Sequence, residues 1–128
     1  MIVTLWRWRA TVMAASVTAL AGLLRFANLG HPRALVFDEV YYARGAYSLI
    51  KLGYEGKWND DNGHFAQGDF SDLTTNPDYV VHPMVGKLLI AAGMKIGGNN
   101  PFGYRLAGAF LGTMTVLIVA LLVRRIMK

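Results

Sequence analysis

Near its carboxyl end, the sequence contains an uncharged apolar run long enough to cross a membrane. Residues 106–123, LAGAFLGTMTVLIVALLV, are 18 consecutive positions without a charged side chain. A transmembrane helix needs about 20 predominantly apolar residues. A second run near the start is uncharged from Ala10 to Leu24 and, counted with its interfacial flank, covers residues 10–29. The two runs predict an all-α integral membrane protein with two transmembrane helices, joined by a large loop at residues 30–105.

The composition agrees with a membrane protein and excludes several other classes. The chain is 54% hydrophobic and only 16% charged, whereas charged residues make up about 25% of a typical soluble domain. There is no cysteine, so a disulfide framework and a thiolate metal site are excluded. The net charge is +5, but the basic residues are scattered or flank apolar runs, without a nucleic-acid-binding motif. We therefore expect membrane lipid, and no nucleic acid, among the partners.

The distribution of charge predicts how the chain crosses the membrane. The terminal segments, residues 1–9 and 124–128, carry only positive charges, and all eight acidic residues lie within 38–78. Positive flanks tend to stay in the cytoplasm. We expect a multi-pass protein of the cell membrane in which both ends of this segment are cytoplasmic and the loop is extracytoplasmic.

The first apolar run has an alternative interpretation as a secretory signal peptide. It follows a basic start, and Ala19-Leu20-Ala21 resembles a cleavage site. Because the apolar run continues through Leu24, an uncleaved anchor is favoured.

The loop contains signals for local structure. Residues 38–52 have the pattern of a short helix, and residues 54–78, rich in Gly, Asn and Asp, are expected to be irregular. Residues 83–96 are apolar and too short to span comfortably, which fits a helix lying in the membrane interface. The Gly-Gly-Asn-Asn-Pro segment at 97–101 would end that helix and lead into the second span.

Two adjacent carboxylates, Asp38 and Glu39, stand between apolar and aromatic residues at the start of the first predicted loop helix. One interpretation is structural: Asp38 caps the helix and Glu39 favours the positive end of its dipole. The other is chemical, because a carboxylate near apolar surface is costly unless paired, and such sites often carry out proton chemistry. The residues alone leave both open.

Four basic residues are further candidates. Arg25 and Arg105 bracket the acidic loop at the outer ends of the two spans; they could reach toward headgroups, pair with Asp38 or Glu39, or bind a phosphate. His82 and Lys87, at the start of the second loop helix, are supporting candidates, although a lone histidine is more often structural.

No metal site is expected. The three histidines lack metal-ligand spacing. The segment 60–63, Asp-Asp-Asn-Gly, is similar to a calcium loop, but Trp58 stands where the first ligand belongs and Asp69 replaces the usual final Glu.

Two blocks of the sequence resemble the protein O-mannosyltransferases, particularly their actinobacterial members. The blocks are LLRFANLGHPRALVFDEVYYARGAYSLIKLGYE and YVVHPMVGKLLIAAGMKIGGNNPFGYRLAGAFLGTMTV. They stand in the family's order and spacing, and Met84-Val85 replaces the usual Pro-Leu. The resemblance implies the N-terminal part of a GT-C glycosyltransferase. Family members have many more spans, so we expect this segment to lack most of the donor pocket and to be inactive by itself.

The resemblance also implies a reaction and its residues. Mannose would pass from polyprenyl- or dolichyl-phosphate mannose to Ser or Thr of acceptor proteins outside the membrane, with no certain cofactor beyond the lipid-linked donor. Asp38 and Glu39 match the family's catalytic pair, and Arg25 and Arg105 match its arginines. Inversion of the anomeric centre in one displacement needs a base that accepts the proton of the Ser or Thr hydroxyl. The leaving lipid phosphate needs a positive charge nearby. Asp38 would be the base, Glu39 its orienting partner, and the arginines holders of phosphate or carboxylate.

Two other functions remain open. One is a related GT-C enzyme that uses another polyprenyl-phosphate sugar. The other is a non-catalytic two-span protein whose loop binds a partner.

Overall fold

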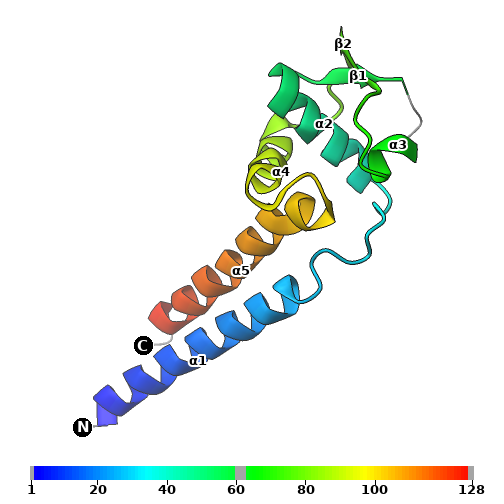
Figure 1. Ribbon diagram of the computed structural model, residues 1–128. Helices are drawn as coiled ribbons and strands as arrows, with labels where there is room; N and C mark the ends of the chain where they lie inside the picture. Colours follow the sequence, from blue (N-terminus) through cyan, green and yellow to red (C-terminus); the bar gives the residue numbers. More distant parts are fainter. Residues whose placement is uncertain (1, 60–62, 127–128) are drawn as a thin grey trace. The chain divides into compact units, whose positions relative to one another are not determined.

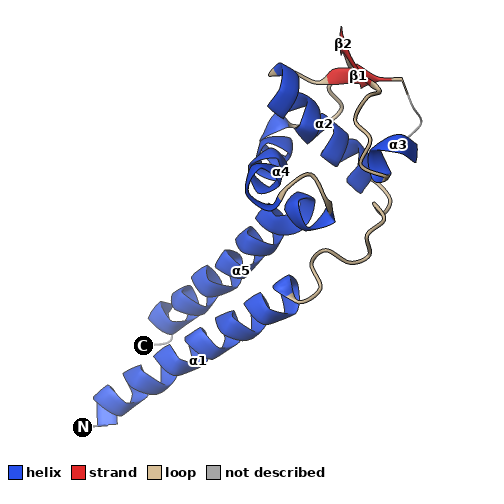
Figure 2. Ribbon diagram, viewed as in Figure 1, coloured by secondary structure: helices blue, strands red, loops and turns tan. Residues whose placement is uncertain are grey.

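A computed structural model describes residues 2–59 and 63–126 of the chain, which are mostly helical (Figure 1). Within these residues, five helices and two short strands follow one another (Figure 2). They are α1 (Ile2–Phe26), α2 (Glu39–Leu52), β1 (Gly56–Trp58), α3 (Gly63–Ala66), β2 (Leu73–Pro77), α4 (Met84–Gly97) and α5 (Pro101–Ile126). The chain divides into two compact units, and α5 contributes to both.

The first unit consists of Met1–Asn28 and Ala109–Lys128. It contains most of the two helices that are long and apolar enough to cross a membrane, Trp8–Phe26 and Pro101–Ile126. Where these helices meet, Gly22 lies next to the methyl group of Thr113. Small residues allow membrane helices to approach closely. Two candidate spans agree with the predicted membrane protein, although α1 ends three residues before the expected boundary at residue 29.

The second unit, Leu29–Gly108, contains the loop elements and a small core. Helix α2 packs against α4 through buried residues of both helices. Gly53 ends α2 in a left-handed conformation with φ of 80°, which glycine adopts without steric cost. The predicted helices at 38–52 and 83–96 are thus observed within about one residue of their expected ends.

The core of this unit is small and aromatic. Its members come from α2, α3, α4 and the start of α5: Ala43, Ala46, Tyr47, Phe65, Ala91, Met94 and Tyr104. Tyr47 stacks on Phe70 with ring centroids 4.4 Å apart. These contacts hold the loop segment 63–70 against the helices.

Residues 54–78, expected to be irregular, contain a two-stranded antiparallel sheet that departs from the all-α prediction. Gly56 pairs with Pro77 and Trp58 with Leu73, with an irregular register between these pairs. The hydroxyl group of Thr74 donates to the carbonyl of Lys57. The strands are too short, and too widely separated by Gly- and Asp-rich sequence, to show a clear alternating pattern.

The turn between α4 and α5 brings the two helices very close together. A Cβ atom added at Gly93 would lie 2.5 Å from the carbonyl oxygen of Gly103, so no larger residue fits there. The side-chain oxygen of Asn100 accepts hydrogen bonds from the N–H groups of Phe102 and Gly103 and so caps α5. Pro101 follows at the first helical position, where its missing N–H costs nothing.

Candidate functional site

Asp38 stands immediately before α2, in the N-cap position that the structural interpretation predicted. Its backbone is helical, with φ of −68° and ψ of −9°, and its side chain makes no capping hydrogen bond. Its backbone carbonyl accepts the N–H groups of Tyr41 and Tyr42. The carboxylate is exposed and does not perform the capping role that would explain it structurally.

The residue before it is held in an unfavourable conformation. Phe37 has φ of 54°, in the left-handed region that bulky residues rarely occupy, and its side chain is 87% exposed. Such strain costs on the order of 1–3 kcal/mol and concentrates at functional sites.

The Glu39 side chain makes different contacts from that of Asp38, because adjacent helical residues point about 100° apart. Its carboxylate forms a bidentate ion pair with Arg105, with Nε–Oε1 2.6 Å and Nη2–Oε2 2.8 Å. Oε2 also accepts the N–H of Val36 at 3.1 Å.

Arg105 has further hydrogen bonds to the chain between α1 and α2. Its guanidinium donates to the carbonyl oxygens of Leu29, Pro32 and Ala34 at 3.0–3.3 Å. One arginine thus fastens the 29–34 segment and the first turn of α2 to α5. Of the roles predicted for Arg105, this geometry favours the carboxylate partner over the phosphate holder.

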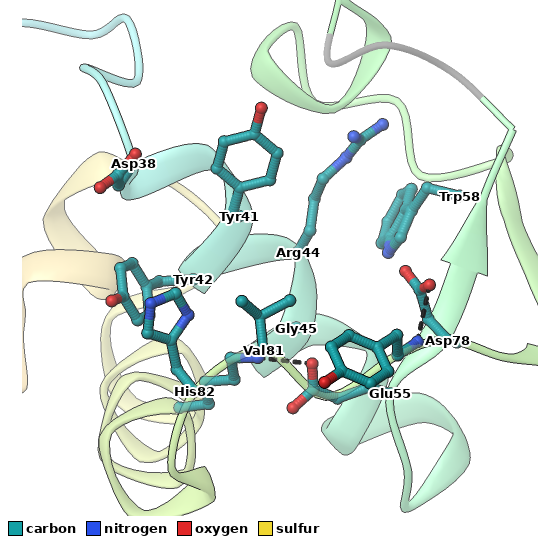
Figure 3. A pocket seen from close by; sticks show the side chains of 13 residues that line it. Asp38, Tyr41, Tyr42, Arg44, Gly45, Glu55, Trp58, Asp78, Val81 and His82 are labelled. Atoms are coloured by element: carbon teal, nitrogen blue, oxygen red, sulfur yellow. Dashed lines mark hydrogen bonds and ion pairs between the residues drawn. The ribbon is translucent and has the colours of Figure 1, made fainter.

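Asp38, His82 and Lys87 line one cavity of about 470 Å³ in the second unit (Figure 3). Figure 3 shows His82 beside Tyr42, and their ring centroids are 5.0 Å apart. Glu39 and Arg105 are not among the lining residues. The remaining lining residues are acidic, aromatic, basic, small or aliphatic: Tyr41, Tyr42, Arg44, Gly45, Glu55, Gly56, Trp58, Asp78, Tyr79 and Val81.

Lys87 is buried in the cavity wall and does not reach solvent. Its Nζ lies 2.5 Å from Oε2 of Glu55, and the two side chains are only 5% and 7% exposed. An expected supporting residue is therefore the partner of a carboxylate that the sequence did not single out.

Sequence reasoning also missed Arg44 and Trp58 as parts of the cavity. Arg44 lies over the Trp58 ring at 5.1 Å, and Trp58 Nε1 donates to Ser48 Oγ at 3.1 Å. Arg44 and Ser48 are both buried although their side chains are polar. Gly45, in the middle of a helical pattern, was the available signal, because such a glycine often marks close approach of another group.

Arg25 belongs to the first unit. It donates from Nη1 to the carbonyl of Ala21 at 3.2 Å, and its side chain lies next to Gly112 of α5. Its predicted role at a phosphate stays a prediction.

Among the described residues, no group of three or more His, Asp or Glu side chains is arranged to hold a metal ion. The calcium-like segment falls largely on residues 60–62, which lie outside the described part of the chain. In the described loop nearby, Asp69 accepts the N–H of Ser71 at 2.9 Å, and this backbone hydrogen bond lowers the pKa of Asp69.

Comparison with known proteins supports the resemblance seen in the sequence. The chain is 38% identical over 127 residues to the polyprenol-phosphate-mannose–protein mannosyltransferase of Mycobacterium tuberculosis (strain ATCC 25618 / H37Rv), covering 95% of this chain and 21% of that protein. It is 31% identical over 124 residues to the protein of the same name from Corynebacterium glutamicum, covering 94% of this chain. The chain is a relative of the polyprenol-phosphate-mannose–protein mannosyltransferases.

The relatives of this mannosyltransferase-like chain are named as glycosyltransferases, and the chain spans about a fifth of their length. A more distant similarity, 32% identity over 95 residues, links it to an undecaprenyl phosphate-alpha-4-amino-4-deoxy-L-arabinose arabinosyl transferase of Pseudomonas aeruginosa (strain LESB58). That match covers 67% of this chain and 17% of the relative. No family model and no solved structure matches the chain.

Proposed function

We propose that this chain forms part of a membrane glycosyltransferase of the GT-C type that transfers mannose from polyprenyl-phosphate mannose to Ser or Thr of proteins. The observation that carries the proposal is the divergence of the two adjacent carboxylates. Glu39 is taken up by Arg105, whereas Asp38 faces a cavity and makes no capping hydrogen bond. A carboxylate exposed in a polar, aromatic cavity is suited to accept a proton.

In the proposed reaction, Asp38 accepts the proton of the acceptor hydroxyl while the hydroxyl oxygen bonds to C1 of mannose. The bond from C1 to the carrier phosphate breaks with its electron pair, which leaves the lipid phosphate as an anion and inverts the anomeric centre. General base catalysis of this kind contributes about 10²–10⁴ in rate. Glu39 orients Asp38 indirectly, by holding the first turn of α2 through its pair with Arg105.

The departing phosphate needs positive charge. Arg105 has its donors engaged by Glu39 and three carbonyl groups. His82 and Arg44 are the basic residues at the cavity besides Lys87, and the predicted phosphate role of Arg25 stays a separate prediction.

Asp38→Asn tests the assignment, in the complete natural protein that carries this chain. The protein is assayed in membranes with polyprenyl-phosphate mannose and a Ser/Thr-rich acceptor peptide. Turnover should fall by about 10²–10⁴, because the amide cannot accept the proton. Stability should be unchanged, because Asn fits the N-cap position as well as Asp and no cap hydrogen bond is present to lose.

Asp69→Asn is the matched control. Asp69 is exposed and is not among the residues that line the cavity, and an amide oxygen can still accept the N–H of Ser71. Its turnover should match wild type. Wild-type turnover in Asp38→Asn as well would overturn the catalytic role and favour the non-catalytic alternative.

The similarity to the arabinosyl transferase supports a second candidate function, the transfer of another polyprenyl-phosphate sugar. Competition between lipid-linked mannose and lipid-linked aminoarabinose in the same assay distinguishes the two. Preferential transfer of aminoarabinose would replace mannose as the donor.

A further inference from the structure

A buried ion pair forms part of the cavity wall, and its contribution to stability alone does not account for it. Lys87 Nζ and Glu55 Oε2 are 2.5 Å apart, with both side chains more than nine-tenths buried. Removing two charges from water costs several kcal/mol each, so a buried pair is often no more stabilising than apolar residues of the same size. The pair therefore calls for an explanation beyond stability.

The fold makes room for this pair at the expense of local helix propensity. A Cβ atom added at Gly45 would lie 3.0 Å from Lys87 Cδ and 3.3 Å from Glu55 Oε2. Glycine inside a helix costs roughly 0.5–1 kcal/mol relative to alanine. Helix α2 therefore has a residue of low helix propensity at the position where Lys87 and Glu55 contact it.

The second oxygen of the carboxylate is the feature that points to a ligand. Oε1 of Glu55 is buried, and none of the described residues offers it a hydrogen bond. A buried acceptor without a partner is costly, and each such group in a native protein needs an explanation. Glu55 and Lys87 both line the cavity that contains Asp38, so a molecule bound in that cavity would lie next to this carboxylate.

The surroundings indicate which class of donor fits. An ionised carboxylate can only accept hydrogen bonds, so the group that meets it must carry a proton. Lys87 already balances its charge, which favours a neutral hydroxyl over an ammonium group. The cavity volume of about 470 Å³ falls within the range of small-molecule sites. Trp58, fixed by its hydrogen bond to Ser48 and with Arg44 over its ring, adds an aromatic edge to the cavity lining.

We propose that Glu55 is a specificity-determining residue whose Oε1 accepts a hydrogen bond from one hydroxyl group of the transferred sugar, while Lys87 fixes the position of the carboxylate. The proposal rests on the function proposed above and adds how the sugar is selected. It explains the buried pair, the unpartnered oxygen and the glycine in α2 together.

The test pairs changes in the enzyme with changes in the donor, using the complete natural protein in membranes. The donors are polyprenyl-phosphate mannose and its 2-, 3-, 4- and 6-deoxy analogues. With the wild-type protein, one deoxy donor should lose about 10- to 100-fold in kcat/KM, as expected for a lost hydrogen bond to a charged group. In Glu55→Gln, whose amide oxygen can still meet Lys87, mannose itself should lose a similar factor, and that deoxy donor should lose no more.

Glu39→Gln is the matched control, because Glu39 is not among the cavity-lining residues. Whatever it does to turnover, it should keep the wild-type ratio between mannose and the deoxy donors. If Glu55→Gln fails to accumulate, Glu55→Asp retains the charge, withdraws the oxygen by one methylene group, and should abolish the same ratio.

If the ratio of kcat/KM between mannose and the deoxy donor is the same in the wild type and in either Glu55 variant, the role of Glu55 is overturned. A wild-type protein that accepts every deoxy donor as well as mannose would also overturn it. Failure of the proposed function looks different, because the wild-type protein would then transfer no mannose at all.

Discussion

The ion pair of Glu39 and Arg105 yields the sharpest prediction, because it separates two roles for one arginine. Arg105→Lys keeps the positive charge but replaces a planar fork with a single ammonium group. Arg105 makes five hydrogen bonds, two to Glu39 and three to carbonyl groups of the 29–34 segment. A lysine in that place can satisfy one carboxylate oxygen and one nearby carbonyl.

The expected loss follows from the bonds that disappear. Three bonds are lost, each worth about 0.5–1.5 kcal/mol net, and partial exposure lets water replace some of them. The two side chains of the pair are 18% and 21% exposed. We therefore expect the 29–38 segment to open more easily by about 2 kcal/mol, which is roughly 30-fold in its opening equilibrium.

Hydrogen exchange of the complete protein in lipid nanodiscs measures this opening. The Val36 amide is the most direct reporter, because it donates to Glu39 Oε2. Arg105→Lys and Glu39→Gln should each accelerate exchange at Val36, and the double variant should be no worse than the more severe single variant, since each change disrupts the same pair. kcat/KM should follow the same non-additive pattern, because the segment leads directly into Asp38.

Additive effects in the double variant would refute this reasoning. A rise in donor KM for Arg105→Lys, with unchanged exchange at Val36 and unchanged KM in Glu39→Gln, would instead show that Arg105 binds the donor phosphate.

Two further predictions concern packing and topology. Gly45→Ala should lower the thermal stability of the detergent-solubilised protein, because the added Cβ presses on Lys87 and Glu55. Gly86→Ala is the control: nothing lies within 4 Å of its added Cβ, so it should be neutral or stabilise by up to about 1 kcal/mol. Stabilisation by both changes would mean that the Lys87 and Glu55 side chains move aside without cost. Asp69→Cys should react with an impermeant thiol reagent outside intact cells and Ile126→Cys should not, and the opposite labelling pattern would reverse the predicted orientation.

The four longer helices were predictable from the sequence because their signals are local, whereas the short helix α3 lies in the segment that was expected to be irregular. The boundaries of α2 and α4 follow from Asp38, Gly53 and Pro83, whereas α5 begins at Pro101, five residues before the span predicted from residue 106. The sheet was missed because β1 and β2 pair across a long intervening segment, and a three-residue strand has too few positions to show a period.

The site was predictable only in part. Asp38, His82 and Lys87 were named separately, and tertiary packing gathers them around one cavity. The different roles of Asp38 and Glu39 depend on the tertiary contacts of each side chain. Arg105, the partner of Glu39, lies 66 positions away in the sequence. Glu55 carries no local signal at all, since its environment is created by Lys87, 32 residues later.

The Lys87–Glu55 pair leads to a last prediction, in which stability and sugar selection separate. Lys87→Met removes the cation and leaves a buried carboxylate without compensation, which typically costs 3–5 kcal/mol. Adding Glu55→Gln removes that charge, so the double variant should regain most of the thermal stability measured in detergent. It should not regain discrimination among deoxy donors, because the amide neither carries the charge nor is held by Lys87. A double variant as unstable as Lys87→Met alone would show that the uncompensated charge is not the cause. A double variant that selects donors like the wild type would show that the ion pair does not read the sugar, and the cavity would then have to discriminate through other side chains such as Trp58.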